Sequence, residues 1–248
     1  MNLGIMTPKK THEINPKMFF SPIAMLGVPY LVMKMTEEKS KHMTRAILSS
    51  TKNWMVGFPI NYIFFMWARK NNIIETGKIP LRRFIKEVLL QLLFIDTWFY
   101  WAHRLLHTKH LYFLHKEHHS FNPTTTMSYV AMSIPEYLIE NIGYYIGGPL
   151  LWKILGGKLS SRGWAFANAL VAFWASVFHS NSLSFSLKKI NINGPDEHHL
   201  HHKHGMKNYN FSLIFLHWDL LMGTYKINDN DKVNDKVNDK VNDKVKGN

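Results

Sequence analysis

Five blocks of apolar residues follow one another along the chain, separated by polar stretches. They cover residues 19–33, 54–68, 84–102, 129–155 and 164–178. The first and last blocks contain no charged residue, whereas a helix on the surface of a soluble protein would have a charged face. Trp, Tyr and Phe gather near the block ends, as is typical of side chains at a membrane interface. The pattern therefore predicts an all-α protein that is a polytopic membrane bundle.

The lengths of the blocks leave a second interpretation open. A spanning helix needs roughly twenty residues, and several blocks are shorter, so each block alone also fits a buried helix of a soluble bundle. Because five blocks occur in one chain, we favour a membrane bundle of about four spanning helices. The N-terminus lacks the arrangement of a cleavable signal peptide, so we expect the first block to remain in the mature protein.

The end of the chain is a four-residue repeat with a single valine in each VNDK unit. One valine in four cannot bury enough apolar area to offset the entropy that ordering would cost. We therefore expect residues 226–248 to form a disordered tail without a catalytic role.

The composition of the chain limits the partners and the kinds of site that it can have. The 248 residues include 30 Lys and Arg against 17 Asp and Glu, a net charge of +13, and the tail contributes little to this excess. A basic excess is typical of proteins that meet nucleic acid, an anionic membrane or an acidic partner. The sequence shows no soluble basic recognition element, so we expect no nucleic-acid partner. The chain has no cysteine, which excludes disulfides, thiolate zinc sites, iron–sulfur clusters and cysteine nucleophiles.

Histidine is the most informative residue type, because twelve of the fifteen histidines lie between positions 103 and 204. Spacings of three and four residues place side chains on one face of a helix. Nine histidines fall into this pattern or stand alone after an apolar block: His103 and His107; His115, His118 and His119; His179; and His198, His201 and His202. The other candidates, His110, His199, His204 and His217, fall outside the pattern and fit surface or supporting positions.

Repeated helical spacing distinguishes these clusters from surface histidines or a loose zinc-buffering tract, which tolerates any spacing. A zinc site is complete with four protein ligands or with three and a water. Nine histidines exceed one site and predict two metals with open positions. Imidazole binds Zn, Fe, Cu and Ni alike, so the spacing leaves the metal open. A membrane metal transporter is the alternative from another class, and it predicts ligands spread across the membrane depth and no lipid-sized cavity.

The clusters and their flanks resemble a known family. DTWFYWAHRLLH at 96–107, HKEHHSFNPT at 115–124, and HHLHH, NYNF and WDLLMGTY between 198 and 225 are similar to the fatty acid hydroxylase/sterol desaturase superfamily of membrane di-iron oxygenases. The resemblance implies that the nine histidines bind two iron ions in a cytosolic helical cap. It also implies that the protein uses O2 to hydroxylate or desaturate a lipid and that it is located in the endoplasmic reticulum. The resemblance covers the oxygenase domain at 84–225, and together with the apolar blocks and the repeat it divides the chain into membrane segments at 1–83, this domain and the tail at 226–248.

The three histidine clusters at 103–107, 115–119 and 198–202 are called the histidine boxes below. Within the superfamily, the third box, HHLHH, and the closing WDLLMGTY look most like sterol C5-desaturases. C4-methyl sterol oxidases, fatty-acid hydroxylases and alkylglycerol hydroxylases remain alternatives. We expect a sterol substrate.

Two further expectations concern supporting groups. We expect no catalytic residue beyond the metal ligands. Asp96 lies two helical turns before His103 and is predicted to fix an imidazole tautomer, with Asp219 as a second candidate.

The chain has no Gly-rich dinucleotide motif, so we expect the electrons for the reaction to come from another protein. The resemblance implies cytochrome b5 and its NAD(P)H-dependent reductase, and the basic charge is complementary to an acidic carrier.

Overall fold

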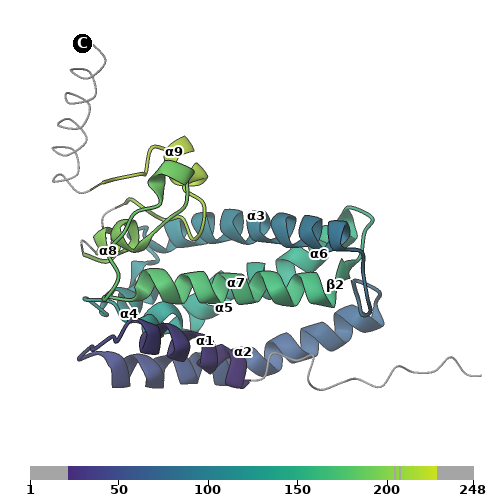
Figure 1. Cartoon of the computed structure of the whole chain (residues 1–248), viewed down its shortest axis with the longest axis horizontal. Helices are drawn as coiled ribbons and strands as arrows, with labels where there is room; N and C mark the ends of the chain where they lie inside the picture. Colours follow the sequence, from purple (N-terminus) through teal and green to yellow (C-terminus); the bar gives the residue numbers. More distant parts are fainter. Residues whose placement is uncertain (1–21, 204, 207, 228–248) are drawn as a thin grey trace, which may run out of the picture.

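A computed structural model describes residues 22–203, 205–206 and 208–227 (Figure 1). The predicted tail lies outside the described residues except for Lys226 and Ile227, as do the first residues of the apolar block at 19–33. The expectation of disorder in the tail therefore stays a prediction.

The described chain is mostly helical, which confirms the predicted all-α class. The α-helices are α1 (Pro22–Met35), α2 (Met43–Lys70), α3 (Leu81–Leu106), α4 (Tyr112–His119), α5 (Ile134–Ile142), α6 (Gly148–Ile154), α7 (Ser161–His179), α8 (Pro195–Lys203) and α9 (His217–Leu221). Short 3-10 helices η2 (Thr126–Val130) and η4 (Lys188–Ile190) and the π-helix η3 (Gly143–Gly147) connect them.

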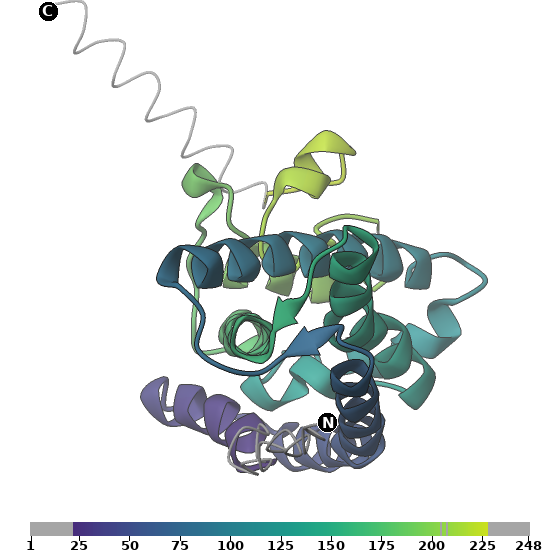
Figure 2. The ribbon, with the colours of Figure 1, turned by 90° about the vertical axis from the view of Figure 1, so that its right-hand side faces the viewer.

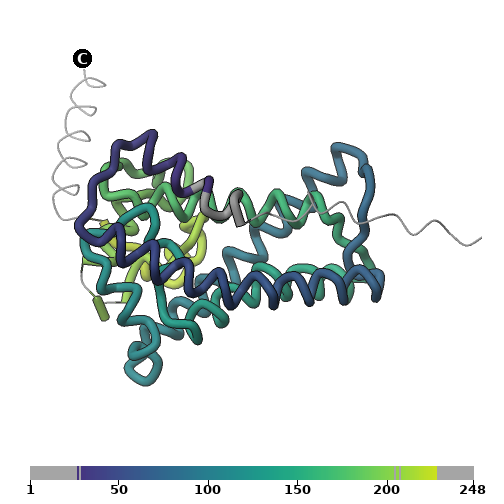
Figure 3. The backbone as a smooth tube through the Cα atoms, turned by 90° about the horizontal axis from the view of Figure 1, so that it is seen from below, coloured from purple at the N-terminus to yellow at the C-terminus, as the bar shows by residue number. Residues whose placement is uncertain are grey.

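Helices α3 and α7 pack along each other and form the centre of the molecule (Figure 1). Their facing side chains make the largest buried core, in which Ile95 of α3 and Phe178 of α7 are almost completely inaccessible. Leu213, from the segment after α8, closes this core. Both helices end on the side of the molecule where α4 and α8 lie, while α2 runs across the lower face (Figure 3).

A small strand pair holds the opposite end. β1 (Ile74–Glu75) and β2 (Leu159–Ser160) pair in parallel, with Ile74 opposite Leu159 (Figure 2). Glu87 of α3 accepts a hydrogen bond from the backbone N–H of Ser160 at 3.1 Å. These contacts connect α2, α3 and α7 at the end remote from the histidines.

The apolar block at 129–155 is divided rather than continuous. Pro135 stands in the first turn of α5 and Pro149 in the first turn of α6, with the π-helix between them. Proline suits the first turn of a helix because an N–H there has no intrahelical acceptor. The two prolines therefore mark helix starts within the block.

Among residues 22–203, 205–206 and 208–227, no helix combines the length and apolar character that crossing a bilayer requires. The prediction of about four spanning helices is not confirmed.

Candidate metal centre

The fold brings together all nine histidines of the predicted pattern, and each is at least 93% buried. Their ring nitrogens form two clusters, in each of which the nitrogens lie within 4.8 Å of one another. The five-histidine group consists of His103, His107, His115, His119 and His201, and the four-histidine group of His118, His179, His198 and His202. Each group mixes residues that are far apart in the sequence.

Four helices deliver these side chains from their C-terminal ends. His103 lies in the last turn of α3, His179 ends α7, and the box histidines of α4 and α8 include residues in their last turns. The C-terminus of a helix carries a partial negative charge, which stabilises a nearby cation. The convergence of these helix ends therefore favours a cation among the histidine rings of each group.

Backbone carbonyls fix the orientation of several rings. The Nδ1–H of His103 donates to Phe211 O at 3.0 Å and that of His179 to Ala175 O at 2.7 Å, and His201 Nδ1–H donates to Tyr209 O at 2.8 Å. Since a carbonyl oxygen only accepts, Nδ1 carries the proton in each ring. The Nε2 atom then carries an unprotonated lone pair.

These lone pairs point at one another. The Nε2 atoms of His103 and His115 lie 3.2 Å apart, and the Nδ1–H of His115 also donates to an acceptor. His179 Nε2 lies 3.4 Å from His118 Nε2, and His118 Nδ1 faces Ala131 O at 3.4 Å. Two neutral acceptors at such distances repel each other unless a cation lies between them. The residues therefore fit a metal ion in each group.

Burial keeps the rings in the form that binds metal. It lowers the pKa of His118 to about 4 and that of His201 to about 4. Burial and the neighbouring histidines also lower the pKa of His103 and of His202. At neutral pH these imidazoles are uncharged, and each can offer a lone pair to a cation.

The carboxylate that contacts a histidine of the centre is one that sequence reasoning missed. Glu136, on α5, accepts from His115 Nδ1 at 2.5 Å and is completely buried. Glu136 and Glu140 are acidic residues inside the apolar block at 129–155. A charged side chain in an apolar block needs a buried partner, and that signal was available in the sequence.

Asp96 does not have the predicted role. Its Oδ1 accepts the backbone N–H groups of Ile214 and Phe215, at 2.7 and 3.1 Å, and it makes no hydrogen bond to the nine histidines among the described residues. The helical spacing placed Asp96 on the correct face of α3, but two turns separate it from His103, and the loop after α8 fills that space. The structure assigns ring orientation to backbone carbonyls and Glu136 instead.

Asp219 supports the metal centre through the backbone, without a hydrogen bond to a histidine among the described residues. Its carboxylate accepts the backbone N–H groups of Phe211 and Ser212 at 3.0 and 2.8 Å. Because Phe211 O receives the Nδ1–H of His103, Asp219 holds the carbonyl that orients this ring.

The histidines outside the pattern stand apart from both groups. His110 is exposed, His199 is half-buried, and His217 Nδ1 lies 3.6 Å from Asp96 Oδ2. His204 lies outside the described residues.

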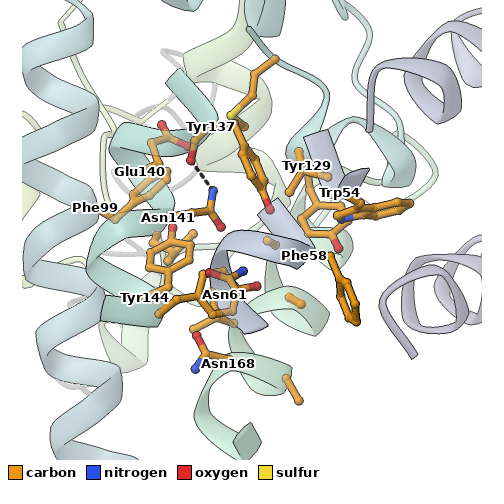
Figure 4. Close-up of a pocket in the computed structure, with 18 of the residues that line it drawn as sticks. Trp54, Phe58, Asn61, Phe99, Tyr129, Tyr137, Glu140, Asn141, Tyr144 and Asn168 are labelled. Atoms are coloured by element: carbon orange, nitrogen blue, oxygen red, sulfur yellow. Dashed lines mark hydrogen bonds between the residues drawn. The ribbon is translucent and has the colours of Figure 1, made fainter. Parts of the chain in front are cut away.

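A pocket opens onto the four-histidine group. Its lining includes His118, His179 and His198 but none of the five-histidine group, and aromatic side chains such as Phe58, Tyr129 and Tyr144 make up much of the rest (Figure 4). The lining reaches along α7 from His179 to Trp164, fifteen residues or about 22 Å at 1.5 Å per residue. Such a cavity suits an elongated apolar molecule with one part at the histidines.

Comparison with known proteins agrees with this chemistry. The family model described as "Fatty acid hydroxylase" matches residues 88–224. Methylsterol monooxygenase erg25A of Aspergillus fumigatus is 32% identical over 180 residues, which are 69% of this chain and 58% of that protein. C-4 methylsterol oxidase erg25 of Schizosaccharomyces pombe is 30% identical over 148 residues, 58% of this chain and 49% of that protein.

A relative of another type covers more of the chain. Delta(7)-sterol 5(6)-desaturase of Leptosphaeria maculans is 27% identical over 220 residues, 84% of this chain and 58% of that protein. The chain spans about half the length of the curated relatives it matches. No solved structure matches the chain significantly.

Proposed function

Because this chain belongs to the fatty acid hydroxylase family, we propose that it is an O2-dependent di-iron oxidoreductase that oxidises a membrane lipid. The observation that carries the proposal is the pair of buried histidine groups, with converging Nε2 lone pairs, at the end of an apolar pocket. A metal transporter would need ligands spread along a path, whereas these nine histidines gather at one end of α3 and α7.

The proposed metal is iron, held by His103, His107, His115, His119 and His201 in one group and by His118, His179, His198 and His202 in the other. Iron supplies the O2 activation that breaking an unactivated C–H bond requires, which zinc cannot supply because it has no redox chemistry. The chain's own residues orient the rings through backbone carbonyls and Glu136. The aromatic lining excludes water and holds the carbon to be oxidised beside the four-histidine group.

The proposed substrate is a sterol. The relatives include methylsterol oxidases and sterol 5(6)-desaturases, whose named positions are neighbours in the sterol ring system. We favour C5-desaturation, with C4-methyl oxidation as the alternative within the sterols and fatty-acid or alkylglycerol hydroxylation beyond them. The elongated pocket supports a lipid of either kind.

The proposed location is the membrane of the endoplasmic reticulum. Large apolar side chains remain exposed on the long helices, among them Met55 and Ile63 of α2 and Leu89 and Leu93 of α3. Extended apolar surface of this kind is typical of contact with lipid or another protein. Electrons would come from cytochrome b5 and its NAD(P)H-dependent reductase, and the basic charge would attract an acidic carrier.

Expression in cells that lack either C4-methyl oxidation or C5-desaturation of sterols, with sterols profiled by mass spectrometry, tests the substrate. We expect the chain to restore one of the two products and the His118→Ala variant, expressed to the same level, to restore neither. An unchanged sterol profile together with a changed fatty-acid or ether-lipid profile would move the substrate to the other branches. Purified protein should hold two iron ions per chain, and one or none after reconstitution would contradict the di-iron proposal.

A further inference from the structure

Glu140 is an acidic side chain in the lining of the apolar pocket, and neither the predicted site nor the metal centre accounts for it. It lies on α5 with 4% of its surface exposed. Within the described part of the chain, its carboxyl group has no hydrogen-bond partner. Because Glu140 lines the pocket, a ligand hydroxyl that pairs with its carboxyl group would gain a hydrogen bond that the described residues do not supply.

The position of Glu140 places it beside the metal centre. A ring nitrogen of His115 and the carboxyl oxygens of Glu136 and Glu140 lie within 4.8 Å of one another. Glu140 follows Glu136 by one helical turn, and it lines the same pocket as His118 and His179. A polar group bound at Glu140 would therefore lie close to both histidine groups.

A second polar site lies in the same pocket, farther from the histidines along α7. Asn168 of α7 donates its Nδ2–H to Trp164 O at 2.7 Å, while its buried Oδ1 has no partner among the described residues. It precedes His179 by eleven residues, about 16 Å along the helix. In the view of Figure 4, Asn168 lies well below Glu140, with Tyr144 and Asn61 at heights between them. A sterol whose 3-hydroxyl is bound at Glu140 would lie in the opposite orientation to one whose 3-hydroxyl is bound at Asn168.

The positions oxidised by the relatives decide between these orientations. In a sterol, C4 is bonded to the carbon that carries the 3-hydroxyl, and C5 is bonded to C4. A ring carbon so near the hydroxyl reaches the metals only if the hydroxyl lies near them too. A hydroxyl at Asn168 would instead bring the far end of the sterol to the histidines.

Building on the proposed sterol oxidation, we propose that Glu140 binds the sterol 3-hydroxyl and thereby sets which end of the substrate meets the metal centre. A carboxyl group can accept the hydroxyl proton in a hydrogen bond and, when protonated, can also donate one. A site built around such a contact rejects an analogue that lacks the hydroxyl, because the buried polar group is then left unpaired.

The test measures binding rather than turnover, using the purified full chain loaded with iron under anaerobic conditions. Cholest-7-en-3β-ol and its 3-deoxy analogue compete with a fluorescent sterol, and the ratio of their dissociation constants is the readout. Wild type should prefer the hydroxylated sterol by about tenfold or more, as expected for one hydrogen bond to a carboxyl group. Glu140→Leu should bring the ratio close to one, and Glu140→Gln should give an intermediate value.

Asn168→Leu is the matched control, since it replaces a polar residue of the same pocket by the same apolar one. It should change both dissociation constants together and leave their ratio unaltered. Iron content and melting temperature show whether each variant is folded. If Glu140→Leu loses iron or does not fold, Glu140→Gln carries the test, because a neutral amide makes a weaker hydrogen bond to the hydroxyl than a carboxylate and must lower the ratio.

Three results would overturn the inference without contradicting the proposed function. The first is a full preference for the hydroxylated sterol in a folded Glu140→Leu or Glu140→Gln variant. The second is loss of the preference in Asn168→Leu. The third is a wild-type protein that binds both sterols equally, which leaves sterol oxidation itself standing. A wild type that binds neither sterol contradicts the proposed function as well.

Discussion

Replacing Glu136 by leucine should weaken metal binding at the five-histidine group and leave the four-histidine group loaded. Glu136 is the only carboxylate among the described residues that hydrogen-bonds one of the nine histidines, with 2.5 Å between its Oε1 and His115 Nδ1. It is completely buried, so water cannot replace it as the acceptor. Without Glu136, the buried Nδ1–H of His115 loses its partner and the ring loses its fixed orientation.

The expected magnitude follows from the kind of contact. Removing a hydrogen-bond partner of a metal-bound histidine costs about 10- to 100-fold in metal affinity, and each factor of ten is about 1.4 kcal/mol. A short contact to a buried carboxylate belongs at the upper end of this range. We therefore expect a loss of about 100-fold for Glu136→Leu, and about 10-fold for Glu136→Gln, whose amide oxygen can still accept.

Anaerobic titration with iron(II), or with cobalt(II) as an optical probe, in competition with a chelator measures the two affinities. Asp96→Asn is the matched control. Asp96 is equally buried but makes no hydrogen bond to the nine histidines in the described part of the chain, and asparagine can still accept from Ile214 N–H. It should leave both affinities unchanged. Unchanged affinities in Glu136→Leu, or equal weakening of both sites, would refute the assignment of Glu136 to one group.

Three further outcomes are expected. His118→Ala should remove metal from the four-histidine group and His201→Ala from the five-histidine group, each abolishing oxidation, so elemental analysis that still finds two metals would contradict the grouping. Gly57→Ala should lower the free energy of unfolding by about 1–3 kcal/mol, because a Cβ there would lie 2.1 Å from the hydroxyl oxygen of Tyr137; an unchanged melting temperature would contradict this. Asp219→Ala strips the acceptor from two buried backbone N–H groups and should cost about 3 kcal/mol in chemical denaturation, with a change below 1 kcal/mol speaking against this role.

The sequence by itself determined the helical class, the family and the histidines that gather in the core. Helical periodicity is a local property, so the apolar block at 164–178 predicts most of α7, and the spacing of His198, His201 and His202 places three rings on one face of α8. The three boxes and their flanks pointed to the family that the family model confirms. Such information lies within a few turns of chain and needs no tertiary contact.

Only the tertiary structure decided how the nine histidines divide and what holds them. His118 and His119 are neighbours in sequence, yet they join different groups, because consecutive positions on a helix point about 100° apart and the elements on either side differ. Glu136 reaches His115 across 21 residues, and Asp96 faces a loop 118 residues away instead of a histidine. These partners are set by the packing of α3, α5 and the segment after α8, which spacing along the chain does not encode.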